Sequence, residues 1–293
     1  MQIAYHIGAH ATDDDRLFKT VLGNVDVLLQ NGVAVPGPGK YRNLIRSTIQ
    51  GLDGAIPAAG ARDILLDSIV EDDDIDRLLL FNANFICVPN RIFEHGVFYP
   101  QAETKPRALR QLFPHDDLSF YIAIKHPATF LQDVLPLTTS KSIGELLGLM
   151  HPTDIRWSDV IKRIKGAAPN AEIIVWCNED TPLIWARLLR LLTNVDDEVE
   201  LTGGLDLLPG LIAPEGLTRL RAHMAANPPE TEFEYETLVA DIWEEFPIPD
   251  AAEEDIDLPE LGADMVAAMS DNYEADIAAI TAMDGVTMVL PFT

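Results

Sequence analysis

Short, almost continuously apolar segments alternate along this chain with longer segments in which apolar residues recur every three or four positions. The first kind has the length and composition of strands buried on both faces, and the second has the spacing of amphipathic helices. The predicted strands are 2–7, 33–35, 77–81, 118–124, 172–176 and 286–290. The predicted helices are 14–30, 41–50, 105–112, 157–165 and 182–192. This alternation predicts a three-layer α/β/α fold with a mainly parallel central sheet.

The C-terminal part of the chain has a different pattern. From 217 to 280 the spacing is helical, with interruptions at Pro228-Pro229 and between Pro247 and Pro259, where proline ends or prevents a helix. A chain of 293 residues, 47% of them apolar, is long enough for one large core. We therefore predict a single α/β domain over 1–293, with 217–280 an acidic, mainly helical elaboration packed on it.

Charge is strongly unbalanced, with 47 acidic residues against 21 basic ones and a formal net charge of −26. After Arg221 there is no further Lys or Arg, while 18 acidic residues follow. Such a chain repels the phosphate backbone, so nucleic acid is excluded as a partner. Two interpretations of the acidic region remain open: a solvated surface, and a docking surface for a basic protein partner.

The sequence also predicts the cellular location of the protein. No run of eighteen apolar residues occurs, and the first residues lack the basic and apolar regions of a signal peptide. We therefore expect a cytoplasmic protein without membrane insertion. Cys87 and Cys177 lie in apolar stretches at a spacing unsuited to zinc, which predicts two buried thiols.

The segment from Gly8 to Asp15 follows the first predicted strand and leads into the first predicted helix. A loop in this position can bind phosphate, because the free backbone N–H groups of the helix point at it. Such a loop normally supplies glycine for close approach, a lysine for charge and hydroxyl groups for hydrogen bonds. Of these chemical groups only the hydroxyl of Thr12 is found at the matching position.

A resemblance to a known family starts at this loop. The segment from His6 to Leu17, with Gly32-Val33 and Pro36-Gly37-Pro38, is similar to the opening of bacterial sulfotransferase-family proteins, which reads His-Ile-Gly-x-His-Lys-Thr-Gly-Thr-Thr. In the matching positions Ala11 replaces the lysine and Asp13 the glycine. Asp14 and Asp15 replace the last two threonines. The loop thus loses one cation and gains three carboxylates.

Two further segments are similar to this family. The segment 120–131 resembles a strand that ends in Arg-Asn-Pro-Ala-Thr-Phe, where the arginine and a serine eight positions later hold the 3'-phosphate of the donor. Lys125 falls on that arginine and Asp133 on that serine. The segment 78–85 resembles a strand followed by Ser-Glu-Asn, and here the triplet reads Asn82-Ala83-Asn84.

The resemblance implies a P-loop-like sulfotransferase fold and a site for the donor 3'-phosphoadenosine-5'-phosphosulfate. The positions implied for that site are Gly8, Ala11, Thr12, Asp13, Asp14, Asp15, Arg16, Lys125 and Asp133. Two like charges 4 Å apart cost about 4 kcal/mol at an effective dielectric near 20, whereas a helix dipole returns only about 0.3–2 kcal/mol. The leading hypothesis is therefore a pseudoenzyme that has lost donor binding, keeps a binding or regulatory role and needs no cofactor.

Other hypotheses remain open. In a divergent active sulfotransferase, Lys125, Arg16 and Lys40 would hold the donor, and His10 would be the general base for an acceptor hydroxyl. A third possibility is an acidic interaction protein for a basic partner. We assign no metal, because a histidine at the end of a buried strand is more often a core residue. Lys40, Arg42 and Arg46 form either an anion site or a solvated helix face.

Overall fold

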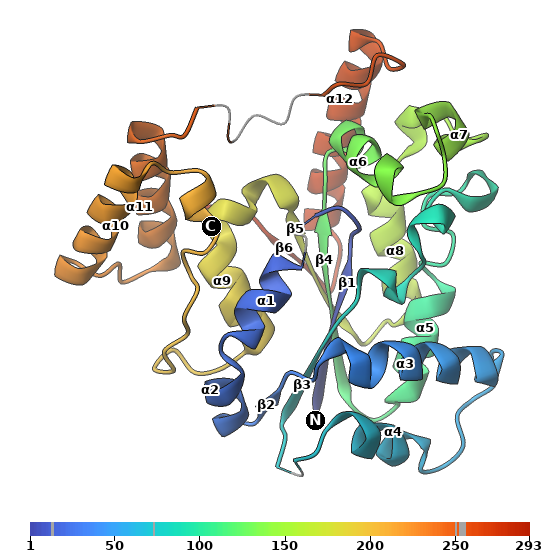
Figure 1. The fold of residues 1–293 in the computed structure, drawn as a ribbon. Coiled ribbons are helices and arrows are strands. Elements are labelled where there is room, and N and C mark those ends of the chain that lie inside the picture. The colour runs from blue at the N-terminus through green and yellow to red at the C-terminus, as the bar shows by residue number, and fades with distance from the viewer. Residues whose placement is uncertain (13–14, 73, 250, 252–255) are drawn as a thin grey trace.

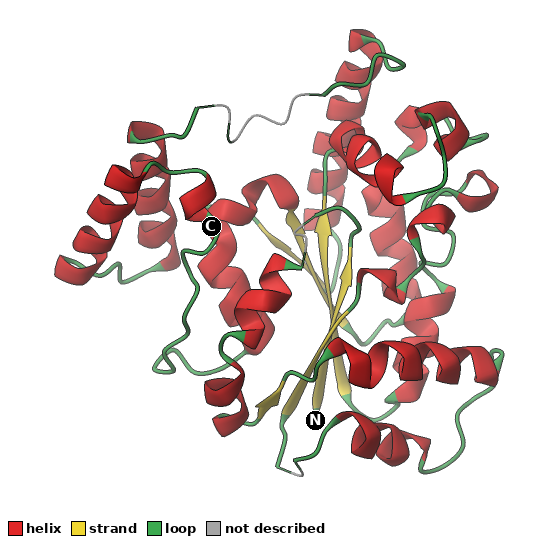
Figure 2. Ribbon diagram, in the orientation of Figure 1, coloured by secondary structure: helices red, strands yellow, loops and turns green. Residues whose placement is uncertain are grey.

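A computed structural model describes residues 1–12, 15–72, 74–249, 251 and 256–293. Within these ranges six strands form one parallel sheet, in the order β2-β3-β1-β4-β5-β6. The strands are β1 (Gln2–Gly8), β2 (Val33–Ala34), β3 (Arg77–Phe81), β4 (Asp117–Ile124), β5 (Glu172–Cys177) and β6 (Val286–Val289). Helices cover both faces of the sheet, which confirms the predicted three-layer α/β/α fold (Figures 1 and 2).

Each predicted strand is present within about one residue of its predicted ends. The helices are α1 (Arg16–Leu22), α2 (Val25–Gln30), α3 (Pro38–Leu52), α4 (Ala61–Ile69), α5 (Thr104–Leu112), α6 (Pro127–Val134), α7 (Ile143–Leu147), α8 (Trp157–Ala167), α9 (Thr181–Thr193), α10 (Pro214–Ala226), α11 (Glu232–Glu245) and α12 (Ala263–Thr281). No helix in these ranges is long and apolar enough to cross a lipid bilayer.

The prediction of one helix over 14–30 was wrong, because the structure has two helices, α1 and α2, separated by Gly23 and Asn24. The buried Asn24 side chain donates to Thr20 O at 2.9 Å and to Thr202 O at 3.0 Å. In return, Asn24 Oδ1 accepts from Thr202 N at 2.7 Å. These bonds to a loop that is distant in sequence satisfy the polar groups of the interruption, and the apolar spacing alone does not reveal them.

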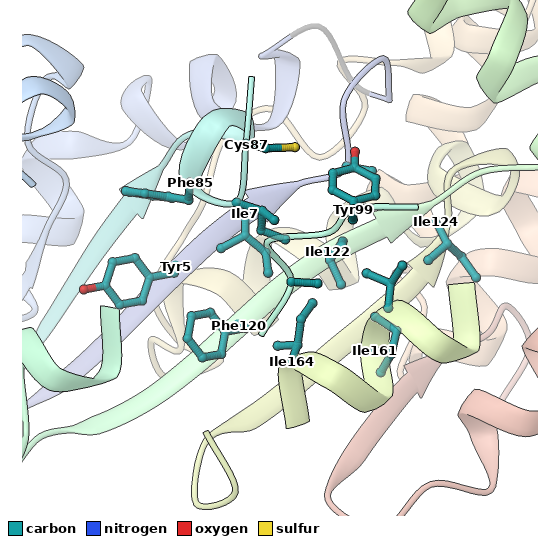
Figure 3. Packing of buried hydrophobic residues seen from close by; sticks show 14 of the residues in the cluster. Tyr5, Ile7, Phe85, Cys87, Tyr99, Phe120, Ile122, Ile124, Ile161 and Ile164 are labelled. Carbon is teal, nitrogen blue, oxygen red and sulfur yellow. The ribbon is translucent and has the colours of Figure 1, made fainter. Parts of the chain in front are cut away.

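The sheet separates two apolar clusters, because successive strand residues point to opposite faces. On one face, Tyr5, Phe120 and Ile122 belong to a large cluster that also includes Ile161 and Ile164 of α8 (Figure 3). On the other face, α1 and α9 cover Phe81, Tyr121 and Trp176, among others. Both cysteines are free thiols and are buried, as predicted.

The acidic C-terminal region divides between two places. Helices α10 and α11 pack together around a third, smaller cluster that includes Leu220 and Val239, and α11 contacts α9. Helix α12 instead packs against α8 on the face of the large cluster, through Met269, Tyr273 and Ile280 (Figure 1). Fourteen of the 18 acidic residues after Arg221 lie at described positions, and all of these except Glu236 and Asp276 are exposed.

Candidate functional site

The main cavity lies at the carboxyl ends of the parallel strands, next to the point where the strand order reverses. After the central strand β1, the chain forms β2 and β3 on one side of β1 and then β4 on the opposite side. Ligands of open α/β sheets bind at such a switch point. The cavity has a volume of about 880 Å³, and its lining includes residues of the segments that follow β1, β4 and β5.

Ionised side chains in the lining of this cavity balance one another. Arg16 and Lys125 supply two positive charges, and Asp133 and Glu179 supply two negative charges. Apolar side chains such as Leu211 and Trp243 complete part of the wall. A site for a highly charged nucleotide requires an excess of cations, and the described lining residues do not supply one.

Several residues that the sequence singled out lie together in this lining: Ala11, Thr12, Arg16, Lys125 and Asp133. Lys125 Nζ lies 2.6 Å from Asp133 Oδ2, and the lysine side chain is only 4% exposed. The two positions that would hold a 3'-phosphate are therefore bound to each other.

The hydroxyl group of Thr12, in the loop after β1, forms a hydrogen bond within that loop. Thr12 Oγ1 donates to Ala9 O at 3.0 Å, and Ala9 N donates to Ala123 O of β4 at 3.0 Å. Gly8 has a φ of 124°, a conformation that only glycine adopts readily, and it ends β1 outside the cavity lining. Asp15 precedes α1 and lies 3.8 Å from Arg42 Nη2. Asp13 and Asp14 lie outside the described residues.

His10 is buried beside this loop and is outside the described lining of the cavity. Its Nδ1 lies 2.8 Å from Tyr99 Oη, and its Nε2 lies 3.1 Å from Asn84 Oδ1. Because Asn84 Oδ1 can only accept, Nε2 carries the proton, and Nδ1 accepts the hydroxyl proton of Tyr99. Burial lowers the pKa of His10. The one basic lone pair of this imidazole is therefore already occupied, which does not suit a general base.

The sequence did not single out a second group of polar residues at the cavity. Glu179 follows β5, and its carboxylate accepts from His126 N at 2.7 Å and from the Tyr273 hydroxyl at 2.9 Å. His126 Nε2 lies 2.9 Å from Ser270 Oγ. Burial, and next the Glu179 charge, raise the pKa of Tyr273. The signal that could have found Glu179 is its position two residues after the end of a buried strand.

Asp180, the neighbour of Glu179, has its pKa raised to about 6 by burial and by the nearby charge of Glu179. In an unfolded chain an aspartate titrates near 3.9. The folded protein therefore holds this proton more tightly, so stability falls as the pH rises from about 4 to about 6. We expect Asp180→Asn to raise the melting temperature at pH 8 and to leave it nearly unchanged at pH 4.

The control for this prediction is Glu172→Gln, which removes a charge from the exposed start of β5. Thermal melts of both variants at pH 4 and pH 8 measure the effect. A gain for Asp180→Asn that is the same at both pH values would contradict the assignment, because ionisation of Asp180 would then not be its cause.

Within the described ranges, no group of three or more His, Cys, Asp and Glu side chains has the arrangement of a metal site. His6, near the end of β1, stacks on Phe81 with ring centroids 5.3 Å apart and is buried in the core.

Fold and cavity together define a three-layer α/β/α protein with a ligand-sized cavity at the switch point of its sheet. No protein-family model matches the chain, and no curated protein matches it significantly.

Proposed function

We propose that this chain is a sulfotransferase-like binding protein that no longer holds a phosphosulfate donor. The observation that supports this most directly is the 2.6 Å ion pair between Lys125 and Asp133. A donor phosphate would have to displace Asp133 from Lys125 and would then face that carboxylate at close range. Repulsion of this kind costs several kcal/mol where screening is weak.

The charge balance of the cavity supports the same conclusion. Arg16 is exposed at the start of α1, and Lys125 is already paired with Asp133. These two cations therefore do not form a complete phosphate site. Leu207, Leu211 and Trp243 form an apolar part of the cavity lining, which suits a ligand with low charge. We therefore propose a binding role for this cavity, with no donor or other cofactor.

An active sulfotransferase is the weaker alternative. Its acceptor hydroxyl would need a general base, and both ring nitrogens of His10 are engaged by Tyr99 and Asn84. The third hypothesis, a basic protein partner, draws on the exposed acidic residues after Arg221. Those residues lie on α11, on α12 and on the segments beside these two helices, which favours a solvated surface over one docking face.

The deciding experiment is a calorimetric titration with adenosine 3',5'-bisphosphate, the nucleotide product of sulfuryl transfer. We expect wild type to show no binding at millimolar concentration that depends on Lys125. A variant that carries Ala11→Lys, Asp13→Gly, Asp14→Thr, Asp15→Thr and Asp133→Ser should gain binding, because it restores a cation and removes four carboxylates.

Two single variants complete the design. Lys125→Ala reports on the cavity, and Lys162→Ala removes a charge from the exposed face of α8 as a control. Wild-type binding that is abolished by Lys125→Ala but retained by Lys162→Ala would refute the loss of the donor site. Turnover of the phosphosulfate donor with the same dependence would establish the active transferase instead.

A further inference from the structure

A second cavity lies between α3 and the segment that follows β3. It has a volume of about 290 Å³ and shares no described lining residue with the main cavity. Four of its lining residues are cationic: Arg42 and Arg46 of α3, Arg91, and Lys105 of α5. Arg42 and Arg46 are four residues apart and so lie on the same face of their helix. We call this cavity the basic pocket.

The charge of the basic pocket is opposite to that of the whole protein. The chain has more than twice as many acidic as basic residues, yet no Asp or Glu occurs among the described residues that line this pocket. Its other polar groups are amides, including those of Asn82 and Asn84. Cations that outnumber the carboxylates around a cavity attract anions.

Two of the four cations have partners at the rim of the pocket. Arg42 Nε donates to Phe81 O at 2.9 Å, and its Nη2 lies 3.8 Å from Asp15 Oδ1. Arg91 pairs with Glu94 at 2.7 Å. With the side-chain amide of Gln101 oriented to satisfy its hydrogen bonds, its oxygen also accepts from Arg91 at 2.8 Å. These contacts orient the two guanidinium groups in advance.

The other two cations, Arg46 and Lys105, have no carboxylate within ion-pair distance in the part of the chain that the structure describes. Lys105 is partly buried, and this burial, and next the Arg91 charge, lower its pKa. A cation that loses hydration without gaining a counter-ion has a cost in free energy. An anion bound in the pocket would remove that cost.

We propose that the basic pocket binds a small oxyanion, phosphate or sulfate, either free or as the monoester of a small carrier. Guanidinium groups match the oxygens of such an anion in geometry, and the amides complete its hydrogen bonds. The volume, at the lower limit of ligand clefts, accommodates the anion and a carrier of a few atoms. Phe85, Ile86 and Cys87 form an apolar part of the lining, and all three belong to the large cluster. Figure 3 shows Phe85 and Cys87 within that cluster.

Calorimetric titrations with sodium phosphate, sodium sulfate and glycerol 3-phosphate test this site, with sodium chloride at equal ionic strength as the reference. We expect saturable binding of the oxyanions and none of chloride. Tighter binding of glycerol 3-phosphate than of phosphate would identify a phosphate monoester as the ligand class, and equal binding would identify the free anion. Both results support the site, whereas equal heats from chloride and phosphate would overturn it.

The variants locate the binding. Arg46→Ala and Lys105→Ala should each weaken phosphate binding about tenfold, the loss of one charge-assisted hydrogen bond. Lys162→Ala, which removes an equal charge outside both cavities, should leave binding unchanged. Far-ultraviolet circular dichroism verifies that each variant is folded. Phosphate binding that is unaffected by Arg46→Ala and by Lys105→Ala would refute the basic pocket as its site.

The same variants separate this inference from the proposed function. Adenosine 3',5'-bisphosphate also carries phosphate groups, so its binding to wild type has two possible sites. Binding that Lys105→Ala abolishes and Lys125→Ala retains belongs to the basic pocket and leaves the proposed function intact. The opposite dependence belongs to the main cavity and refutes the proposed function alone.

Discussion

Replacing Asp276 with alanine is expected to lower the free energy of unfolding by about 2–4 kcal/mol, a large part of the stability of a typical domain. This carboxylate of α12 is fully buried and accepts three hydrogen bonds from the start of α8. Arg156 Nε lies 2.9 Å from Oδ1, Trp157 N lies 2.7 Å from Oδ2, and Ser158 Oγ lies 2.5 Å from Oδ1.

The physical reason for this effect is that Asp276 caps α8 from another helix. Arg156, the N-cap residue of α8, provides no side-chain cap of its own. Without Asp276 the Trp157 N–H would be buried without a partner, and Arg156 would lose its counter-ion. Trp157 also donates from Nε1 to Lys125 O at 2.7 Å, so this cap supports the wall of the main cavity.

Urea unfolding of Asp276→Ala and Asp271→Ala measures this prediction. Asp271 is on the same helix but exposed, so the control removes the same charge from α12 without opening a buried contact. We expect Asp271→Ala to change the stability by less than about 0.5 kcal/mol. Equal unfolding midpoints for the two variants would show that the buried carboxylate has no capping role.

Glu236→Ala is expected to lower the free energy of unfolding by about 2–4 kcal/mol as well and to loosen α10 and α11. Glu236 is 1% exposed, and its Oε1 lies 3.3 Å from Arg187 Nη1 of α9. Its other oxygen accepts from Phe292 N. Arg187 Nη2 in turn donates to Leu290 O at 2.8 Å. One buried carboxylate thus joins α11, α9 and the residues after β6.

Without Glu236, the mostly buried Arg187 would keep Glu232, whose carboxylate lies 3.5 Å away and is largely exposed. That pair is too solvated to replace the lost contact. Limited proteolysis measures the local effect, and we expect faster cleavage between α10 and α11 in Glu236→Ala. Asp241→Ala, an exposed change on the same helix, is the matched control. Identical cleavage rates would exclude Glu236 as the anchor of α11.

Apolar runs are a sufficient guide to the sheet because its strands are buried on both faces and tolerate few polar residues. For this reason the sequence predicted β3 and β5 almost residue for residue. The break between α1 and α2 was not predictable, since Asn24 is bonded to Thr202, a residue 178 positions away. Helix periodicity contains no information about such a partner.

The candidate sites, like the fold, were predictable from the sequence only in part. The family resemblance indicated Lys125 and Asp133 as candidate site residues, but only the structure shows that the two side chains pair. The basic pocket was partly visible, because Arg42 and Arg46 stand out in a chain with few bases. Arg91 and Lys105 come from other elements, and no local spacing connects them with α3. Sequence patterns identify what a single element presents, whereas sites between elements depend on how those elements pack.

The position of β1 at the centre of the sheet has a consequence for biosynthesis. Because β1 precedes the other strands in the chain, the ribosome releases the central strand before its neighbours. Strands β4, β5 and β6 then join one edge in the order in which they are made, each beside a strand already present. Folding can therefore follow translation on this side of the sheet, because each new strand finds its hydrogen-bonding partner already synthesised.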